Sequence, residues 1–255
     1  MKRLLKISFD SLFFSLMPII QWFLLGLLVD KNLINVFSIT YPLQFIYSFI
    51  KSVFGVAPNI QAEKENEKNF VMSGLVLGIL FTFLVFGLFY INVDNFIRFM
   101  NIDVQTYHDF CAFSISQLAL HSIFAILMEK LYYEEKNTKA NVYTILFNIV
   151  SLGSLLSLSL ITKNQMIITN ESLLMMLICI VIMFILEYSS VKMTANMFVS
   201  SGIRVVSSFL PTPFCTSIGQ LVSSIYQLVT TSIYMKKFNK NKEKEYELRP
   251  IETGI

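Results

Sequence analysis

Long uncharged runs dominate this chain. Six of them contain no Asp, Glu, Lys or Arg, and each has at least 19 residues: Ser11–Val29, Asn32–Ile50, Phe70–Val93, Phe110–Met128, Ala140–Thr162 and Val205–Met235. A helix needs about 20 apolar residues to cross a bilayer, whereas a barrel strand shows about ten residues of alternating polarity. The pattern therefore predicts transmembrane helices. We place them at about 8–29, 33–60, 70–92, 105–132, 139–162, 167–189 and 204–234.

Composition strengthens this interpretation. The 255 residues are 55% hydrophobic and 15% charged, with a mean hydropathy of +0.62, against about 25% charged residues in an ordinary soluble domain. The net charge of +3 combines a basic N-terminus with a mixed-charge C-terminus, so it does not indicate a nucleic-acid partner. We expect an all-α, polytopic bundle of six to seven transmembrane helices in a lipid bilayer.

The distribution of charge divides the chain and orients it. We expect a six-helix bundle over residues 1–190, a cytoplasmic linker with an extra apolar helix over 191–235, and a polar, disordered tail over 236–255. Lys and Arg are frequent at the N-terminus and in the second, fourth and sixth connections, and sparse in the other three. The positive-inside rule then places the N-terminus in the cytoplasm. The predicted location is the cell membrane.

The seventh span does not fit this alternation. It would carry five lysines between residues 236 and 244 to the outside, against the positive-inside rule. Pro211 and Pro213 would also disturb a helix near its start. Whether Val205–Met235 crosses the membrane is therefore open.

Two ionisable residues lie deep in the predicted spans. His121 is near mid-membrane, with Gln117 one turn earlier on the same helix face. Lys51 is a cation inside an apolar run and needs a water-filled cavity or an acidic partner, such as Glu63 or Glu187. Ionisable groups at such depth are candidates for a substrate or ion pathway. The alternatives are a neutral imidazole bonded to a neighbouring helix and a structural ion pair.

Uncharged polar and small residues suggest further roles. Gln21 is the only strongly polar side chain in the C-terminal half of the first span, and Asn148 is buried in the fifth span. Both are pathway candidates, although a buried Asn more often bonds between helices. Gly74 and Gly78 form a GxxxG pair, which favours close helix packing.

No pattern of catalytic or metal-binding residues is visible. His108 and His121 lack an HExxH spacing and a third ligand, and Cys111, Cys179 and Cys215 are too far apart for a metal or disulfide framework. We therefore expect neither an enzyme nor a resident cofactor.

The second span and the loop after it resemble the second helix of MATE-type (multidrug and toxic compound extrusion) transporters. Their sequence, SITYPLQFIYSFIKSVFGVAPNIQAEKENEKN, has Tyr41-Pro42 near the helix start, where the family has Tyr or Phe before Pro. A Gly-containing stretch and a charged loop follow, from Gly55 to Asn69.

Two other segments are similar to the same family. EKLYYEEKNTKANVYTILFNIVSLGSLL joins a charged loop to a helix with a buried Asn148, as in the family's crossing from helix four to helix five. Gly74 and Gly78 agree with its glycine-rich third helix. The resemblance covers residues 8–190, which correspond to the family's first six-helix half.

The resemblance implies a transporter that exports drugs or amphipathic organic cations by alternating access, coupled to Na⁺ or H⁺. The family usually has about twelve spans in two halves, so a homodimer or a second transporter half is the implied partner. Cation-coupled members often carry an acidic residue in the first helix, and Ser11–Val29 has none.

Two other functions stay open. The chain can be a truncated remnant or an accessory membrane subunit that does not transport. It can also be a lipid-linked sugar flippase of the same superfamily, but that function requires a more cationic cavity than Lys51 alone supplies.

Overall fold

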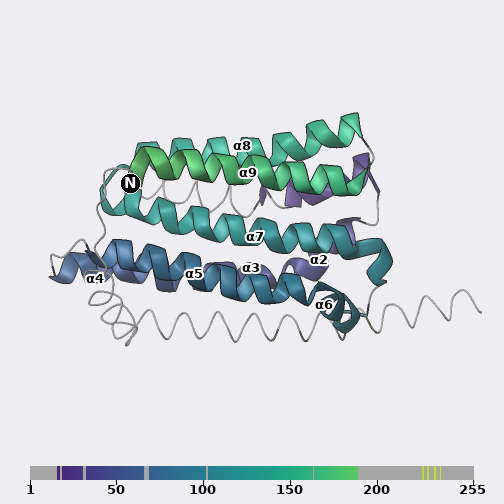
Figure 1. The fold of residues 1–255 in the computed structure, drawn as a ribbon, viewed down its shortest axis with the longest axis horizontal. Helices are drawn as coiled ribbons and strands as arrows, with labels where there is room; N and C mark the ends of the chain where they lie inside the picture. Colours follow the sequence, from purple (N-terminus) through teal and green to yellow (C-terminus); the bar gives the residue numbers. More distant parts are fainter. Residues whose placement is uncertain are drawn as a thin grey trace, which may run out of the picture.

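The structure, a computed structural model, is helical throughout its regular parts. It describes residues 16–17, 19–30, 33–65, 69–101, 103–162 and 164–188, together with 226, 229, 233 and 236. The helices within these ranges are Ile19–Leu28, α2 (Ile34–Thr40), α3 (Leu43–Ile50), η2 (Lys51–Val56), α4 (Ala57–Glu65), α5 (Asn69–Ile91), α6 (Val93–Phe99), α7 (Val104–Tyr133), α8 (Asn137–Ile161) and α9 (Gln165–Tyr188) (Figure 1). The expected all-α class is confirmed for these ranges.

Four helices are long and apolar enough to cross a bilayer. They cover Phe70–Ile91, Tyr107–Tyr133, Asn137–Ile161 and Gln165–Tyr188, close to four of the predicted spans. The first predicted span is described as a helix over Ile19–Leu28. The predicted seventh span and the tail lie outside the described residues, except for four isolated positions.

The second predicted span differs from the single helix expected over 33–60. Tyr41 and Pro42 form a turn between α2 and α3, where the proline ring removes a backbone donor. α3 continues into the π-helix η2 and then into α4, which ends at Glu65. Residues 61–65, which we placed in a charged loop, are therefore helical.

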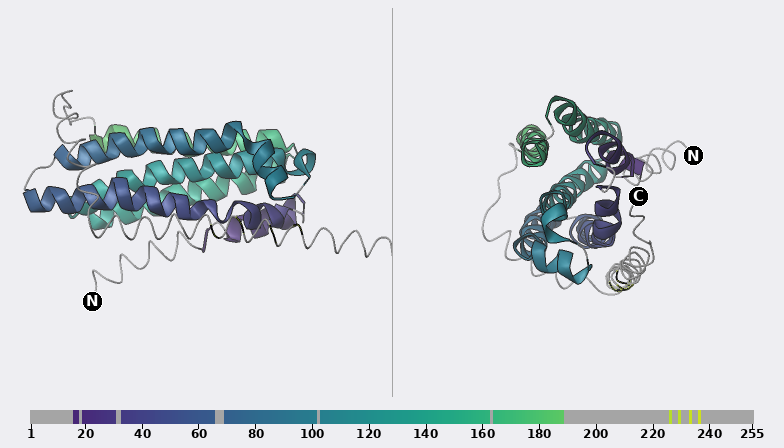
Figure 2. Two further views of the ribbon diagram at one scale, coloured as in Figure 1. Left: turned by 90° about the horizontal axis from the view of Figure 1, so that it is seen from below. Right: turned by 90° about the vertical axis from the view of Figure 1, so that its right-hand side faces the viewer.

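α7 is the central helix of the bundle. It packs against every other labelled helix. Of its most apolar stretch of 18 residues, 78% is buried, against 28–33% for the corresponding stretches of the other three candidate spans. α8 and α9 lie together on one side of α7, with α3 and α5 on the other (Figures 1 and 2). We call the two ends of the bundle the α4 end and the α6 end, after the short helices found there (Figure 1).

The buried face of α8 is rich in polar side chains, which is unusual for a helix in a water-soluble protein. Thr144, Asn148, Ser151 and Ser159 are buried, together with the apolar Ala140, Phe147 and Leu155. The large apolar side chains that α8 exposes are Val142, Ile145, Leu146, Ile149, Leu160 and Ile161. In a bilayer the surrounding medium is hydrocarbon, so polar groups find hydrogen-bond partners only inside the bundle.

Gly74 and Gly78 lie where α5 passes closest to the second span. A Cβ atom at Gly74 would meet the ring of Pro58 and would lie 2.7 Å from the Phe54 carbonyl oxygen. A Cβ atom at Gly78 would lie 2.6 Å from Ile126 Cδ1 and 2.7 Å from Phe54 Cβ. The missing side chains let α5 pack directly against η2 and α4.

Candidate functional site

A cavity of about 120 Å³ lies inside the bundle and is lined largely by polar side chains. Its lining comes from the helix Ile19–Leu28 and from α2, α3, α7 and α8, with Met17 beside them. The lining residues are Met17, Gln21, Trp22, Thr40, Gln44, Tyr47, Ser48, Ser114, Gln117, Leu118, His121, Asn148, Ser151 and Leu152. One buried water needs about 10–15 Å³, so the cavity has room for several.

Four of the five predicted pathway residues meet at this cavity. Gln21, Gln117, His121 and Asn148 all line it, although 96 residues separate Gln21 from Gln117. Lys51 does not belong to the lining. The structure therefore brings most of the predicted pathway together and places Lys51 elsewhere.

A reciprocal amide pair joins the first described helix to α7. Gln21 Nε2 donates to Gln117 Oε1 at 3.0 Å, and Gln117 Nε2 donates to Gln21 Oε1 at 2.8 Å. Gln117 Nε2 also donates to Ser151 Oγ on α8 at 3.1 Å. Each amide thus acts as donor and acceptor, and together they connect three helices without a formal charge.

His121 is fixed by its own helix and by aromatic rings. Its Nδ1 lies 2.8 Å from the Gln117 carbonyl oxygen, which can only accept, so Nδ1 carries the proton. The imidazole meets Phe147 edge-on, with ring centroids 5.1 Å apart, and Phe147 stacks on Phe124 at 4.2 Å. His121 is therefore held in one orientation at the cavity, whose described lining also contains the phenol of Tyr47.

Hydroxyl groups and an amide complete the polar lining. Ser114 Oγ donates to Thr40 Oγ1 at 2.8 Å, and Thr40 Oγ1 donates to the Val36 carbonyl oxygen at 2.9 Å. Asn148 Nδ2 donates to the Thr144 carbonyl oxygen at 2.8 Å. The described lining contains no Asp, Glu, Lys or Arg, so the cavity offers hydrogen bonds and aromatic faces but no permanent charge.

Lys51 instead forms an ion pair between η2 and α7. Its Nζ lies 3.4 Å from Glu129 Oε1, so neither Glu63 nor Glu187 is the partner, contrary to our expectation. A Cβ atom at Gly55 would lie 2.7 Å from Glu129 Cγ, so a side chain here would force the Glu129 side chain out of its present position. π-helical segments often occur at functional sites, and here one presents a cation to a buried acid.

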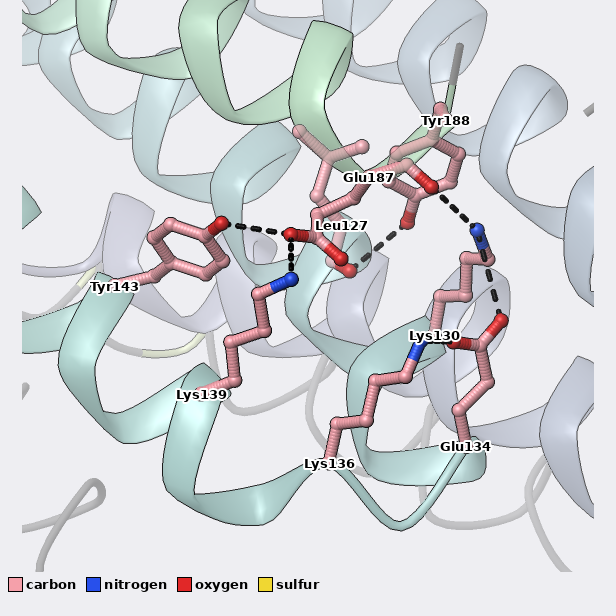
Figure 3. Close-up of polar contacts among 8 residues, drawn as sticks. All are labelled: Leu127, Lys130, Glu134, Lys136, Lys139, Tyr143, Glu187 and Tyr188. Carbon is pink, nitrogen blue, oxygen red and sulfur yellow. Dashed lines mark hydrogen bonds and ion pairs between the residues drawn. The ribbon is translucent and has the colours of Figure 1, made fainter. Parts of the chain in front are cut away.

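A second polar cluster, which we call the α4-end network, joins α7, α8 and α9 (Figure 3). The Glu187 side chain is only 4% exposed; it pairs with Lys139 at 2.5 Å and accepts from Tyr143 at 2.7 Å. Lys130 Nζ donates to the Glu187 carbonyl oxygen at 3.0 Å and lies 4.0 Å from the centre of the Tyr188 ring. Tyr188 in turn donates to the Leu127 carbonyl oxygen at 2.9 Å.

Glu134 extends this network into the turn between α7 and α8. It pairs with Lys136 at 2.6 Å and with Lys130 at 3.6 Å. Partial burial alone would raise the pKa of the Glu134 carboxyl, but the Lys136 hydrogen bond and the charges of Lys130 and Lys136 hold that pKa below its ordinary value. The carboxylate therefore stays charged in its pair.

Sequence reasoning missed both clusters of charge. Glu129 and Lys130 lay inside the predicted span 105–132 and were not singled out, but α7 continues to Tyr133 and buries both. It also missed Ser114 in the cavity, although Ser114, Gln117 and His121 recur at intervals of three and four residues. That spacing is the signal of one helix face.

The described residues bring no three potential metal-binding side chains together. The cavity and the Lys51–Glu129 pair share α7, so this helix contributes side chains to both. No protein-family model, curated protein or solved structure matches the chain.

Proposed function

We propose that the chain is a membrane transporter unit that exports drugs or amphipathic organic cations, coupled to Na⁺ or H⁺, and that it acts as one half of a MATE-type exporter. The observation that carries the proposal is the cavity, where five helices and Met17 bring polar side chains together inside an apolar bundle. Polar groups at membrane depth are costly to bury. A cluster of them around open space supports a solute or ion pathway better than a purely structural role.

The chemistry of the lining supports this class of substrate. Trp22 and Tyr47 line the cavity beside the Gln21–Gln117 amide pair. Aromatic faces attract organic cations, and amide oxygens accept hydrogen bonds from them. A lipid-linked sugar flippase must hold anionic phosphates. The described lining has no cation for that task, since Lys51 lies outside it and is paired with Glu129.

The proposal includes a partner and a location. A MATE-type exporter needs two halves that face one another, so we propose a homodimer or a complex with a second transporter half. Val205–Met235, rich in Ser and Thr, is the proposed bridging segment, and it lies almost entirely outside the described residues. The proposed location is the cell membrane, with the N-terminus in the cytoplasm.

Dye export from cells that lack their own drug exporters tests the cavity. We expect the wild type to expel ethidium, an organic cation, and His121→Ala to lower the initial rate at least tenfold at equal expression. His108→Ala is the matched control, because His108 is on the same helix, exposed, and paired with Asp109 and Asp94 outside the cavity. It should change the rate less than twofold.

Two outcomes would contradict the proposal in different ways. Equal export by the wild type and His121→Ala would mean that transport does not depend on this residue of the cavity. If the wild type expels no dye from cells, and none from proteoliposomes under either a Na⁺ or a pH gradient, the transporter proposal is overturned. The accessory-subunit or remnant function would then replace it.

A further inference from the structure

An apolar groove of about 670 Å³ runs along the outside of the bundle between α5, α7 and α9. Phe83 and Phe86 on α5 form one wall, Leu173 and Leu177 on α9 form the other, and Ile123 belongs to the floor on α7. All the lining residues lie within three of the four candidate membrane spans. The groove is separate from the polar cavity, since the two share no lining residue.

The polar groups of the groove are all at one end. Tyr90, Ser116 and Asn170 are the lining residues with a hydroxyl or amide. α5 runs toward the α6 end, while α7 and α9 begin there, so each of the three lies on the α6 side of the groove (Figure 1). The remaining lining is apolar and, apart from Ile91 at the α6 end, lies toward the middle of the bundle. An occupant that fits this gradient has a polar group at the α6 end and a hydrocarbon part pointing inward.

The length of the groove limits what can fill it. Its lining on α5 runs from Phe83 to Ile91, which corresponds to about 12 Å of helix. The hydrocarbon core of a bilayer is about 30 Å thick, so the groove lies within one leaflet. A transmembrane helix would continue across both leaflets and would be about 10–12 Å wide, whereas a single acyl chain is narrow and ends inside its own leaflet.

Gly87 keeps the groove open. A Cβ atom at this position would meet nothing within 4 Å, so a side chain here would project into the groove without displacing another part of the protein. The same holds for Gly153 on α8, which is exposed and does not line the groove. These two glycines provide a blocking position and a matched control.

We propose that this groove binds one acyl chain of a membrane phospholipid, with the headgroup at the α6 end beside Tyr90 and Asn170. The site is continuous with the apolar outer faces of α5 and α9, where Leu84, Leu88 and Ile178 are exposed. A phospholipid can therefore enter it directly from the bilayer. The inference does not depend on transport activity.

Photo-crosslinking in vesicles tests the groove. The full chain is reconstituted into phosphatidylcholine vesicles that contain a phosphatidylcholine with a diazirine near the end of one acyl chain. After illumination and digestion, we expect adducts to concentrate on the groove residues of α5, α7 and α9. Gly87→Phe should lower this labelling at least fivefold, Gly87→Leu should have an intermediate effect, and Gly153→Phe should change it less than 1.5-fold.

Other results would overturn the proposal. Adducts spread evenly over the outer faces of α8 and α9 would indicate ordinary annular lipid. Labelling of the groove by a diazirine fatty acid but not by the phospholipid would exclude the phospholipid as the occupant. A disulfide from Leu174→Cys to a cysteine in Val205–Met235, or to a second copy, formed in most of the protein would show that protein fills the groove. Thermal melts of each variant verify that a loss of labelling is not a loss of folding.

Discussion

At the residue scale, the most unusual arrangement is the ion pair between Lys51 and Glu129 inside the bundle. The Glu129 side chain is 12% exposed and that of Lys51 is 36% exposed, so the acid is the more deeply buried partner. Asn59 Nδ2 also donates to the Glu129 carbonyl oxygen at 2.9 Å, which ties α4 to the same turn of α7. A buried carboxylate that loses its cation carries a desolvation cost that water does not relieve.

A double-mutant cycle measures this pair. Lys51→Met leaves the Glu129 charge without its cation and should lower the free energy of unfolding by about 1–3 kcal/mol. Lys51→Met/Glu129→Gln removes both charges and should recover at least half of that loss. Thermal melts in detergent micelles, converted with the wild-type unfolding entropy, give both values. A double variant that is less stable than Lys51→Met would mean that the pair is not the source of the effect.

At the element scale, the packing of α5 depends on the absence of side chains at two positions. Gly74 meets the Phe54 backbone and the Pro58 ring, and Gly78 meets Ile126 and Phe54. The Phe54 carbonyl oxygen belongs to η2 and cannot rotate away as a side-chain atom can. Gly87, on the same helix, faces open space, so α5 contains both crowded and uncrowded glycines.

Alanine at these glycines should therefore change stability in opposite directions. Gly74→Ala forces a methyl group against a backbone oxygen 2.7 Å away and should cost about 1–3 kcal/mol through overpacking. Gly87→Ala adds helix propensity without a clash and should gain up to about 1 kcal/mol. The measurement is the melting temperature of each variant in one detergent, which should fall for Gly74→Ala and rise for Gly87→Ala. Equal shifts of the same sign would contradict the packing described for α5.

The helices were easier to predict than their irregularities. Charge-free runs of at least 19 residues located α5, α7 and α8, and a shorter apolar run after Glu171 located α9, because the hydrocarbon of a bilayer excludes charged side chains. The π-helix at Lys51–Val56 left no such signal, since its residues are as apolar as those of an α-helix. The length of α7 was predicted closely, at 105–132 against Val104–Tyr133, but the burial of Glu129 and Lys130 was not, because it depends on partners from other helices.

The candidate site was predictable to a similar extent. Gln21, Gln117, His121 and Asn148 stand out as polar residues in apolar spans, and they meet at one cavity. Their pairing depends on how three distant segments, Ile19–Leu28, α7 and α8, approach one another. The spacing of polar residues along one helix does not show which other helix they face. For the same reason the partner of Lys51 could not be chosen correctly among several acidic residues.

At the scale of the whole molecule, the charged turns gather at the α4 end. α4 ends at Glu65, and the turn between α7 and α8 holds Glu134, Glu135 and Lys136. Asp103, by contrast, precedes α7 at the α6 end. Because α5 and α7 run in opposite directions between these ends (Figure 2), the two groups should be on opposite sides of the membrane.

Cysteine labelling tests this topology in intact cells. In a chain freed of its native cysteines, Glu65→Cys and Lys136→Cys should react with a membrane-impermeant maleimide only after the cells are opened. Asp103→Cys should react at once from outside, because the positive-inside rule places the α4 end in the cytoplasm. Reaction of Glu65→Cys in unopened cells would reverse the orientation or overturn the spanning arrangement.

The π-helix η2 makes the second span tolerant of the loss of one residue. A π turn contains one residue more than an α turn, so loss of a single residue between Lys51 and Val56 would restore the α repeat while α4 keeps its direction around the helix axis. Pro58 would stay against Gly74, and Asn59 would stay against Glu129. The same loss inside a regular α-helix such as α5 would rotate everything after it by about 100°. In this stretch, evolution can delete a codon without turning the helix that follows.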